Sequence, residues 1–138
     1  MAAPATDLLR SVPLFADLSD RELAMMAESM KERHFRAGHV IAKEGSHGVG
    51  FFVIAEGNAQ VTVAGQPVGR LGPGDYFGEI ALIADSDRTA TVTAEAELAC
   101  YGMTSWEFRP LVEENAEIAW KLLQAVARKV RDAERRGD

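Results

Sequence analysis

The feature that most constrains the fold is the pattern of residues between positions 34 and 103. Apolar and β-branched residues there come in short segments separated by glycine-bearing turns. The segments lie at residues 39–44, 50–55, 59–63 and 88–94. A Gly-Pro-Gly run at 72–74 is one of the turn signals. Short strands at this spacing predict an antiparallel sandwich or a jelly-roll barrel.

The residues before this region have a helical pattern. Residues 7–33 contain a capping box formed by Ser19 and Glu22, which predicts that a helix begins there. Apolar residues recur in it at helical spacing, so one face is predicted to be buried. The positions on that face are Leu23, Met26, Ala27 and Met30. We interpret the methionines as core residues and not as ligands.

The helical pattern returns at residues 104–136. Thr104 and Glu107 form a second capping box, and Asn115 is the predicted cap of a final helix of about twenty residues. That helix carries an apolar seam at Ala119, Leu123, Val126, Val130 and Ala133. We expect the seam to lie on the protein's own barrel or to cover a ligand as a lid, and the alternative is a homodimer seam. The expected state is therefore a monomer or a weak homodimer.

These three zones predict the fold class. It is α+β, mainly β: an antiparallel jelly-roll β-barrel flanked by N-terminal helices and two C-terminal helices. The length of 138 residues supports one domain with its own core, over residues 1–138.

Composition narrows the classes of function. The formal net charge of −6 argues against a direct nucleic-acid partner, which would require a basic surface. No apolar run approaches the ~20 residues that a membrane-spanning helix needs. The single cysteine, Cys100, excludes an internal disulfide and is typical of a reducing compartment. The N-terminal residues lack a signal-peptide pattern, so we expect a cytoplasmic protein.

Residues 77–92, Phe-Gly-Glu-Ile-Ala-Leu-Ile-Ala-Asp-Ser-Asp-Arg-Thr-Ala-Thr-Val, combine groups that suit an anionic ligand. Gly78 allows a close approach of the backbone, and residues 80–83 can form one helical turn with unpaired N–H groups at its start. Arg88 supplies a planar, permanently charged fork that suits a phosphate. Glu79, when ionised, accepts hydrogen bonds from a sugar hydroxyl. A small molecule with one phosphate and one free ribose hydroxyl fits this set.

This run resembles the phosphate-binding cassette of cyclic nucleotide-binding domains, the modules of protein kinase A regulatory subunits, cyclic-nucleotide-gated channels and the catabolite activator family. The resemblance extends from Leu8 to about Arg135 and includes residues 50–57. It implies that Arg88 holds the exocyclic phosphate oxygens and that Glu79 takes the ribose 2′-hydroxyl. It also implies that backbone N–H groups near Ile80, Ala81 and Thr89 complete the phosphate shell.

The resemblance is less specific about the base. Val61, Val63 and Leu71 match barrel positions that pack against the purine in the family, and core packing is an equally good interpretation of these three. Thr89 permits guanine without requiring it. Cyclic AMP is therefore the expected ligand, cyclic GMP is the alternative, and no other cofactor is expected.

The sequence departs from the family pattern in two places. Many relatives have proline where this chain has Asp87, and Asp85 is close by. Carboxylates near a bound anion weaken its binding, so we expect Asp87 to point outward. A hydroxyl pair that contacts adenine in the catabolite activator branch is replaced by Ala133 and Glu134. The chain also ends where the helix-turn-helix domain of that branch would begin, so a complete transcription factor of that type is not expected.

The function expected from these features is a non-enzymatic sensor. It would bind a cyclic nucleotide, move its terminal helices, and act on an unknown protein effector in trans or within a larger receptor. One alternative is a cupin-like metalloenzyme, but His34, His39 and His47 lack the His-x-His pair of such sites. The other alternative is a degenerate barrel that serves only as an interaction module, which would not need the cassette residues.

Overall fold

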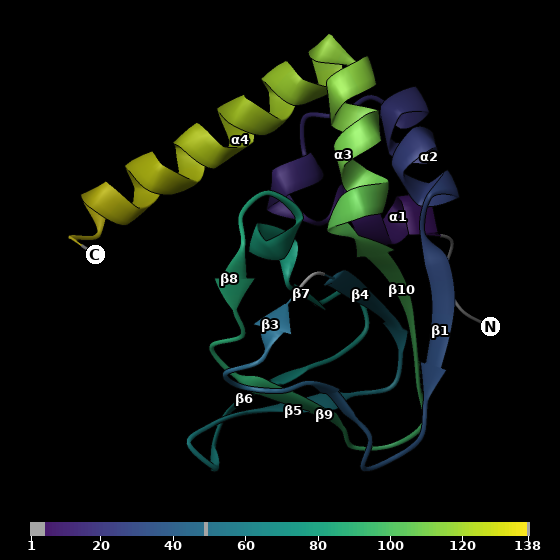
Figure 1. The fold of residues 1–138 in the computed structure, drawn as a ribbon, viewed down its shortest axis with the longest axis vertical. Coiled ribbons are helices and arrows are strands. Elements are labelled where there is room, and N and C mark those ends of the chain that lie inside the picture. Colours follow the sequence, from purple (N-terminus) through teal and green to yellow (C-terminus); the bar gives the residue numbers. More distant parts are fainter. Residues whose placement is uncertain (1–4, 49, 138) are drawn as a thin grey trace.

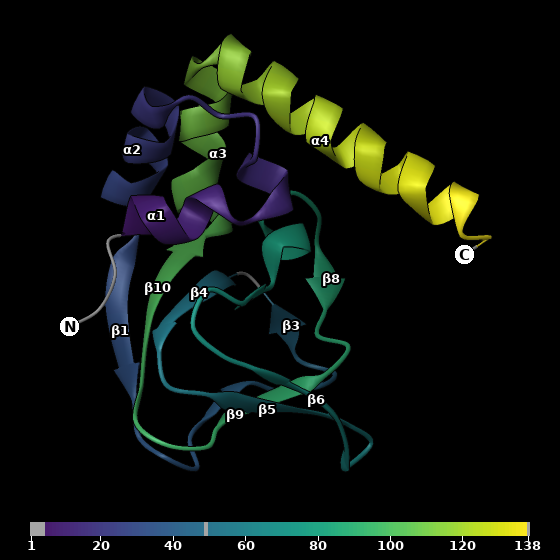
Figure 2. The same cartoon turned by 180° about the vertical axis from the view of Figure 1, so that it is seen from behind.

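The computed structural model describes residues 5–48 and 50–137. A barrel of strands forms one end of the molecule and a group of helices the other (Figures 1 and 2). The helical elements are α1 (Ala5–Arg10), η1 (Pro13–Phe15), α2 (Asp20–Glu28), η2 (Glu79–Leu82), α3 (Ser105–Glu114) and α4 (Ala116–Arg135). The strands are β1 (Lys31–Phe35), β2 (Val40–Ala42), β3 (His47–Gly48), β4 (Gly50–Glu56), β5 (Ala59–Val63), β6 (Gln66–Leu71), β7 (Tyr76–Phe77), β8 (Ser86–Asp87), β9 (Thr91–Ala94) and β10 (Leu98–Thr104).

The strands form two four-stranded sheets and one two-stranded pair. The first sheet has the order β1-β10-β4-β7, the second has the order β2-β9-β5-β6, and β3 pairs with β8. All pairings recorded for the described residues are antiparallel. The strand order is not sequential, as expected for a jelly roll. The predicted fold class is therefore confirmed: helices flank an antiparallel barrel on both sides of it in the sequence.

Two clusters of buried side chains hold this arrangement. The barrel interior contains Ala42, Ile54, Ala59, Val92, Ala94, Leu98 and Cys100. The other cluster joins the helices to the outside of the first sheet, where Phe15 from η1 meets Phe51 from β4 edge to face, with ring centroids 5.7 Å apart. Burying one such aromatic side chain contributes about 1.5–3 kcal/mol, so this cluster fixes the helical group on the barrel.

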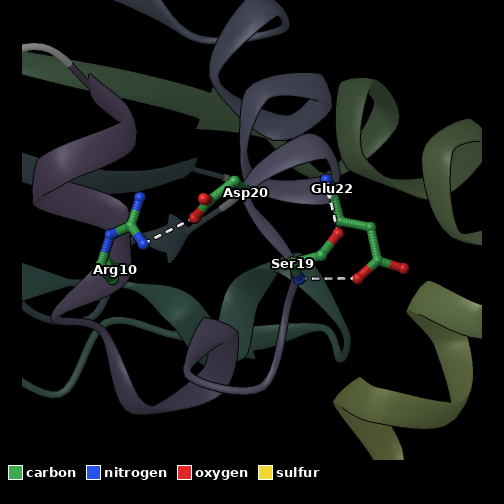
Figure 3. Close-up of polar contacts among 4 residues, drawn as sticks. All are labelled: Arg10, Ser19, Asp20 and Glu22. Atoms are coloured by element: carbon green, nitrogen blue, oxygen red, sulfur yellow. Dashed lines mark hydrogen bonds and ion pairs between the residues drawn. The ribbon is translucent and has the colours of Figure 1, made fainter.

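The capping box predicted at the start of α2 is present (Figure 3). The Ser19 hydroxyl accepts from the Glu22 N–H at 3.2 Å, and the Glu22 carboxylate accepts from the Ser19 N–H at 2.8 Å. An ion pair of 2.7 Å between Arg10 and Asp20 joins the ends of α1 and α2. Met26 is fully buried, as predicted for a core methionine.

The structure corrects the predicted helical zone at residues 31–33. They belong to β1, which pairs with β10 from Lys31 opposite Gly102 to Phe35 opposite Leu98. The charged residues of this segment have no apolar helical period, so local sequence favours neither structure. The free edge of β10 decides the outcome because it supplies hydrogen-bond partners for the backbone. The predicted strand at 88–94 is also shorter, since β9 begins only at Thr91.

The capping box of α3 is present, and Asn115 is the N-cap residue of α4 as predicted, but its side chain makes no capping bond to that helix. Its side-chain amide donates instead to the Leu111 carbonyl at 2.7 Å, so it satisfies the end of α3. The backbone of Asn115 has φ −134° and ψ 89°, which places a sharp bend between α3 and α4.

The seam predicted on α4 is not buried on the barrel. The buried residues are Ile118, Leu122 and Ala125, one position away from the predicted set. On the predicted seam, Leu123 is 61% exposed and Val130 is 54% exposed. The reason is tertiary: α4 packs on η1 and α3, and that contact selects a different face of the helix. Beyond this contact α4 runs outward, and its C-terminal end lies away from the barrel (Figures 1 and 2).

Candidate functional site

The cassette residues lie where η2 crosses the end of the barrel, between β7 and β8. Gly78 is the N-cap residue directly before η2 and has a left-handed backbone, φ 85° and ψ 11°. A Cβ at this position would collide with the Gly50 carbonyl oxygen and would lie 2.6 Å from Nη1 of Arg88. Only glycine fits both the backbone angle and the space, which brings the start of η2 directly against the arginine.

Arg88 follows β8 and is fixed by its backbone and by its side chain. Its N–H donates to the Ser46 carbonyl and its own carbonyl accepts from Gly45, both at 2.8 Å. Nη2 donates to the Gly50 carbonyl at 2.7 Å. The guanidinium also lies against Gly48, where a Cβ would be 2.6 Å from its Cζ. The two glycines thus make room for the side chain on both sides.

The electrostatic state of Arg88 suits an anion. Burial lowers the pKa of its guanidinium, because a partly desolvated cation is less stable than one in water. Within residues 5–48 and 50–137, no carboxylate lies within ion-pair distance of this guanidinium. A half-buried cation without an anionic partner is costly, and a bound phosphate would remove that cost.

Glu79 is the first residue of η2, and its side chain is 17% exposed. Its Oε1 accepts from Nζ of Lys129, on α4, at 3.2 Å. Nearby, burial raises the pKa of the Tyr76 hydroxyl, the negative charge of Glu79 raises it further, and Lys129 partly opposes this rise. The Glu79 carboxylate therefore lies in a partly enclosed place, in contact with the Lys129 ammonium group.

A hollow of about 320 Å³, here called the cassette cavity, brings these groups together. Its size is at the lower end of small-molecule pockets. It is lined by six of the predicted residues: Gly78, Glu79, Ile80, Ala81, Arg88 and Thr89. The lining also includes Asp87, which the sequence marked as a departure from the family pattern, and residues that were not predicted as site residues: Ala42, Phe77, Ser86, Ala90 and Val92. The apolar residues in this group belong to the barrel region, and their sequence pattern indicates only core packing.

The backbone N–H of Ala81, which we expected to face a bound phosphate, already has a partner within the turn. The N–H of Ala81 donates to the Gly78 carbonyl at 3.0 Å and so closes the turn of η2. The reason is that η2 is a 3-10 turn, with i to i−3 bonds, which uses its donors one residue earlier than an α-helix does. The N–H groups at the start of the turn, at Glu79 and Ile80, have no partner within it.

The three residues predicted to contact the purine lie elsewhere. Val61, Val63 and Leu71 are on β5 and β6 and do not line the cassette cavity. Val61 and Leu71 pack against the barrel core, while Val63 is 37% exposed. Their contact with a base stays a prediction.

Asp87 lies at the rim of the cavity and is 73% exposed, consistent with the expected outward direction. It faces His47, whose Nδ1 is 3.8 Å from Asp87 Oδ1 and whose Nε2 is 4.0 Å from Asp85 Oδ1. Sequence reasoning considered His47 as a metal ligand, set that role aside, and missed this pairing. The register of β3 with β8 places His47 opposite Asp87. The described part of the chain contains no cluster of three residues that could hold a metal ion.

A larger hollow of about 690 Å³, here called the helical groove, lies between η2, α3 and α4. Its lining is mostly apolar, and several side chains in it are well exposed, including Ile83, Trp106 and Leu123. Two of its charged residues, Arg109 and Glu113, pair with each other at 3.3 Å. It lacks the convergent donors and glycines of the cassette cavity, so we place the candidate site in the smaller hollow.

Comparison with known proteins gives the family. The model of the cyclic nucleotide-binding domain matches residues 32–115. The chain belongs to this family. The resemblance seen in the sequence is thus confirmed, and the match ends where α4 begins.

The domain is similar to proteins of several kinds. It is 34% identical over 124 residues to a cGMP-dependent protein kinase of Drosophila melanogaster, covering 84% of this chain and 13% of the kinase. It is 41% identical over 93 residues to a cAMP-dependent protein kinase regulatory subunit of Eremothecium gossypii, covering 67% of this chain and 20% of the subunit. The chain therefore spans a fifth or less of these two curated relatives.

A solved structure matches nearly the whole chain. It is the N-terminal domain of a transcriptional regulator from Streptomyces coelicolor, with a TM-score of 0.87 and 32% identity. The match covers 92% of this chain and 94% of that one.

Among the described residues of the cyclic nucleotide-binding domain, no helix has the length and apolar character required to cross a membrane.

Proposed function

We propose that this domain binds a cyclic nucleotide, in the first place cyclic AMP, and is a sensor and not an enzyme. Binding would move its terminal helices, and through them it would act on a protein partner or on the rest of a longer receptor. The observation that carries the proposal is the half-buried guanidinium of Arg88, which lines the cassette cavity and has no carboxylate partner within residues 5–48 and 50–137.

The geometry supports a definite orientation of the ligand. The exocyclic phosphate oxygens would lie against Arg88 and the first N–H groups of η2, where a charge-assisted fork and unpaired donors converge. The ribose 2′-hydroxyl would donate to Glu79, at the other side of the Gly78 turn. The base would then extend toward β5 and β6, the strands that carry Val61 and Leu71.

Cyclic GMP is the second candidate ligand, and Thr89 is the observation that favours it. This residue follows Arg88 and lines the cassette cavity with an exposed side chain, so its hydroxyl is available to a guanine amino group. The relatives include kinases named for either nucleotide. We place cyclic AMP first because a threonine permits guanine but does not require it.

Isothermal titration with cyclic AMP and cyclic GMP tests the proposal. The parent protein should bind at least one of them, and Arg88→Ala should lose most of that binding. Arg10→Ala is the matched control, because Arg10 lies on α1, pairs with the exposed Asp20 at 2.7 Å and does not line the cavity. No heat of binding for either nucleotide, or equal affinity in the parent and Arg88→Ala, would overturn it.

A further inference from the structure

One contact connects α4 to the cassette cavity. Among the ion pairs that the described residues form, two fasten α4 to the N-terminal segment: Lys121 with Glu22 and Arg128 with Asp17, each at 2.6 Å. The third, Lys129 with Glu79 at 3.2 Å, reaches a residue that lines the cavity. The Glu79 carboxylate is also the group that we assign to the ribose 2′-hydroxyl.

The C-terminal half of α4 has little else to hold it. Its last fully buried side chain is Ala125, and from Val126 to Gly137 every described residue is at least partly exposed. Val126 and Val130 are 36% and 54% exposed. A helix segment with a largely exposed apolar face is weakly held, so polar contacts, those of Arg128 and Lys129 among them, contribute to its position here.

We infer that Lys129 and the ribose 2′-hydroxyl of the nucleotide compete for the Glu79 carboxylate. In the empty domain, Lys129 fastens the C-terminal half of α4 to η2. When the nucleotide hydroxyl takes the carboxylate, the lysine leaves and that half of α4 is released. This inference rests on the proposed function, because it names the contact by which binding at the cavity reaches the helix.

Thermodynamic linkage gives the competition a measurable consequence. If binding the nucleotide breaks the Lys129 contact, that contact must oppose binding by the same factor. Removing the lysine should therefore tighten nucleotide binding. If Lys129 instead steadied Glu79 for the ribose, removing it would weaken binding. The two roles of Lys129 thus predict opposite changes in nucleotide affinity when the lysine is removed.

The ribose hydroxyl supplies the control for specificity. A 2′-deoxy nucleotide cannot donate to Glu79, so it has no need to displace Lys129. A lysine that acts only by making α4 less stable would change the affinity for both nucleotides alike. A competing lysine changes only the affinity for the ligand that carries the hydroxyl.

The experiment compares Lys129→Met and Arg128→Met with the parent by calorimetry, using cyclic AMP and 2′-deoxy cyclic AMP. Arg128→Met is the matched control: it removes the neighbouring cation of α4, whose partner is Asp17 and not Glu79. Lys129→Met should tighten cyclic AMP binding about two- to fivefold, the range expected from a partly exposed ion pair. Its affinity for the 2′-deoxy ligand should not change, and Arg128→Met should not separate the two ligands.

Hydrogen exchange gives a second readout in the empty protein, where residues 126–135 should exchange faster in Lys129→Met than in the parent. If the parent binds cyclic AMP but Lys129→Met binds it equally or more weakly, the competition is wrong while the proposed function stands. An equal gain for both ligands also contradicts it. If the parent binds neither nucleotide, the proposed function fails and the competition fails with it.

Discussion

The cassette cavity and the helical groove lie on two sides of the same short turn, η2, and they differ in kind. Ala81 lines both. The groove has about twice the volume, 690 Å³ against 320 Å³, but its lining is mostly apolar, and two of its three charged residues, Arg109 and Glu113, pair with each other. The cavity gathers a half-buried cation, a carboxylate and a glycine that no other residue can replace. We therefore place the candidate site by the convergence of polar groups and not by volume.

The largest effect should come from Arg88. Arg88→Ala should weaken cyclic nucleotide binding by about 2–4 kcal/mol, because a charge-assisted contact is lost and the phosphate is left partly unpaired. Arg88→Lys should recover only part of this loss, since a point charge does not reproduce the fork. Calorimetry on both variants measures these changes in affinity. Full affinity in Arg88→Ala would remove the distinction between cavity and groove.

Gly78→Ala should come next. Its Cβ would meet the Gly50 carbonyl and the Arg88 guanidinium, and its backbone is left-handed, which costs a non-glycine residue about 1–2 kcal/mol. Both effects should lower the midpoint of thermal unfolding and nucleotide affinity. Gly65→Ala is the matched control, since it has φ 79° but open space around it. It should lose stability without losing affinity, and a parallel loss of affinity would show that strain alone is responsible.

Glu79→Gln should reduce the discrimination between cyclic AMP and its 2′-deoxy analogue. A hydroxyl bonded to a charged acceptor contributes about 1.5–3 kcal/mol and one bonded to a neutral amide about 1 kcal/mol. The parent should thus prefer cyclic AMP by more than the variant does. If the parent binds both ligands equally, Glu79 serves α4 through Lys129 and does not read the ribose.

Thr89→Ala should have a smaller effect, and on one nucleotide only. Loss of its hydroxyl should lower cyclic GMP affinity by about 1 kcal/mol, the net value of a neutral hydrogen bond. Cyclic AMP affinity should hardly move in the same titration. A matching loss for both nucleotides would mean that Thr89 acts through the local backbone.

The smallest effect should come from the groove. Leu123 is 61% exposed there and lies on the face of α4 away from its buried stripe. Leu123→Ser should leave both nucleotide affinities and the thermal midpoint nearly unchanged, because an exposed substitution rarely shifts stability by more than about 0.5 kcal/mol. A clear loss of nucleotide affinity would show that the groove takes part in binding.

The sequence by itself determined the local features of this protein. The Ser19 and Thr104 capping boxes are present because each depends only on residues three positions apart. The barrel class followed from short strands and glycine turns, and the cassette followed from a contiguous run of residues. Six of its predicted members line one cavity. Those at positions 78–81 share one short turn, whereas Arg88 is also held in place by contacts with residues 45–50.

The tertiary structure decided the features that depend on partners distant in sequence. The edge of β10 made residues 31–33 a strand, and the packing of α4 on η1 and α3 buried Ile118, Leu122 and Ala125 in place of the predicted seam. Val61 and Leu71 fit a core face and a ligand face equally well as a pattern, and only the closed barrel placed them against its core. The contact of Lys129 with Glu79 joins residues fifty positions apart, so no local pattern encodes it. Packing between distant elements chooses among faces that the local sequence leaves equivalent.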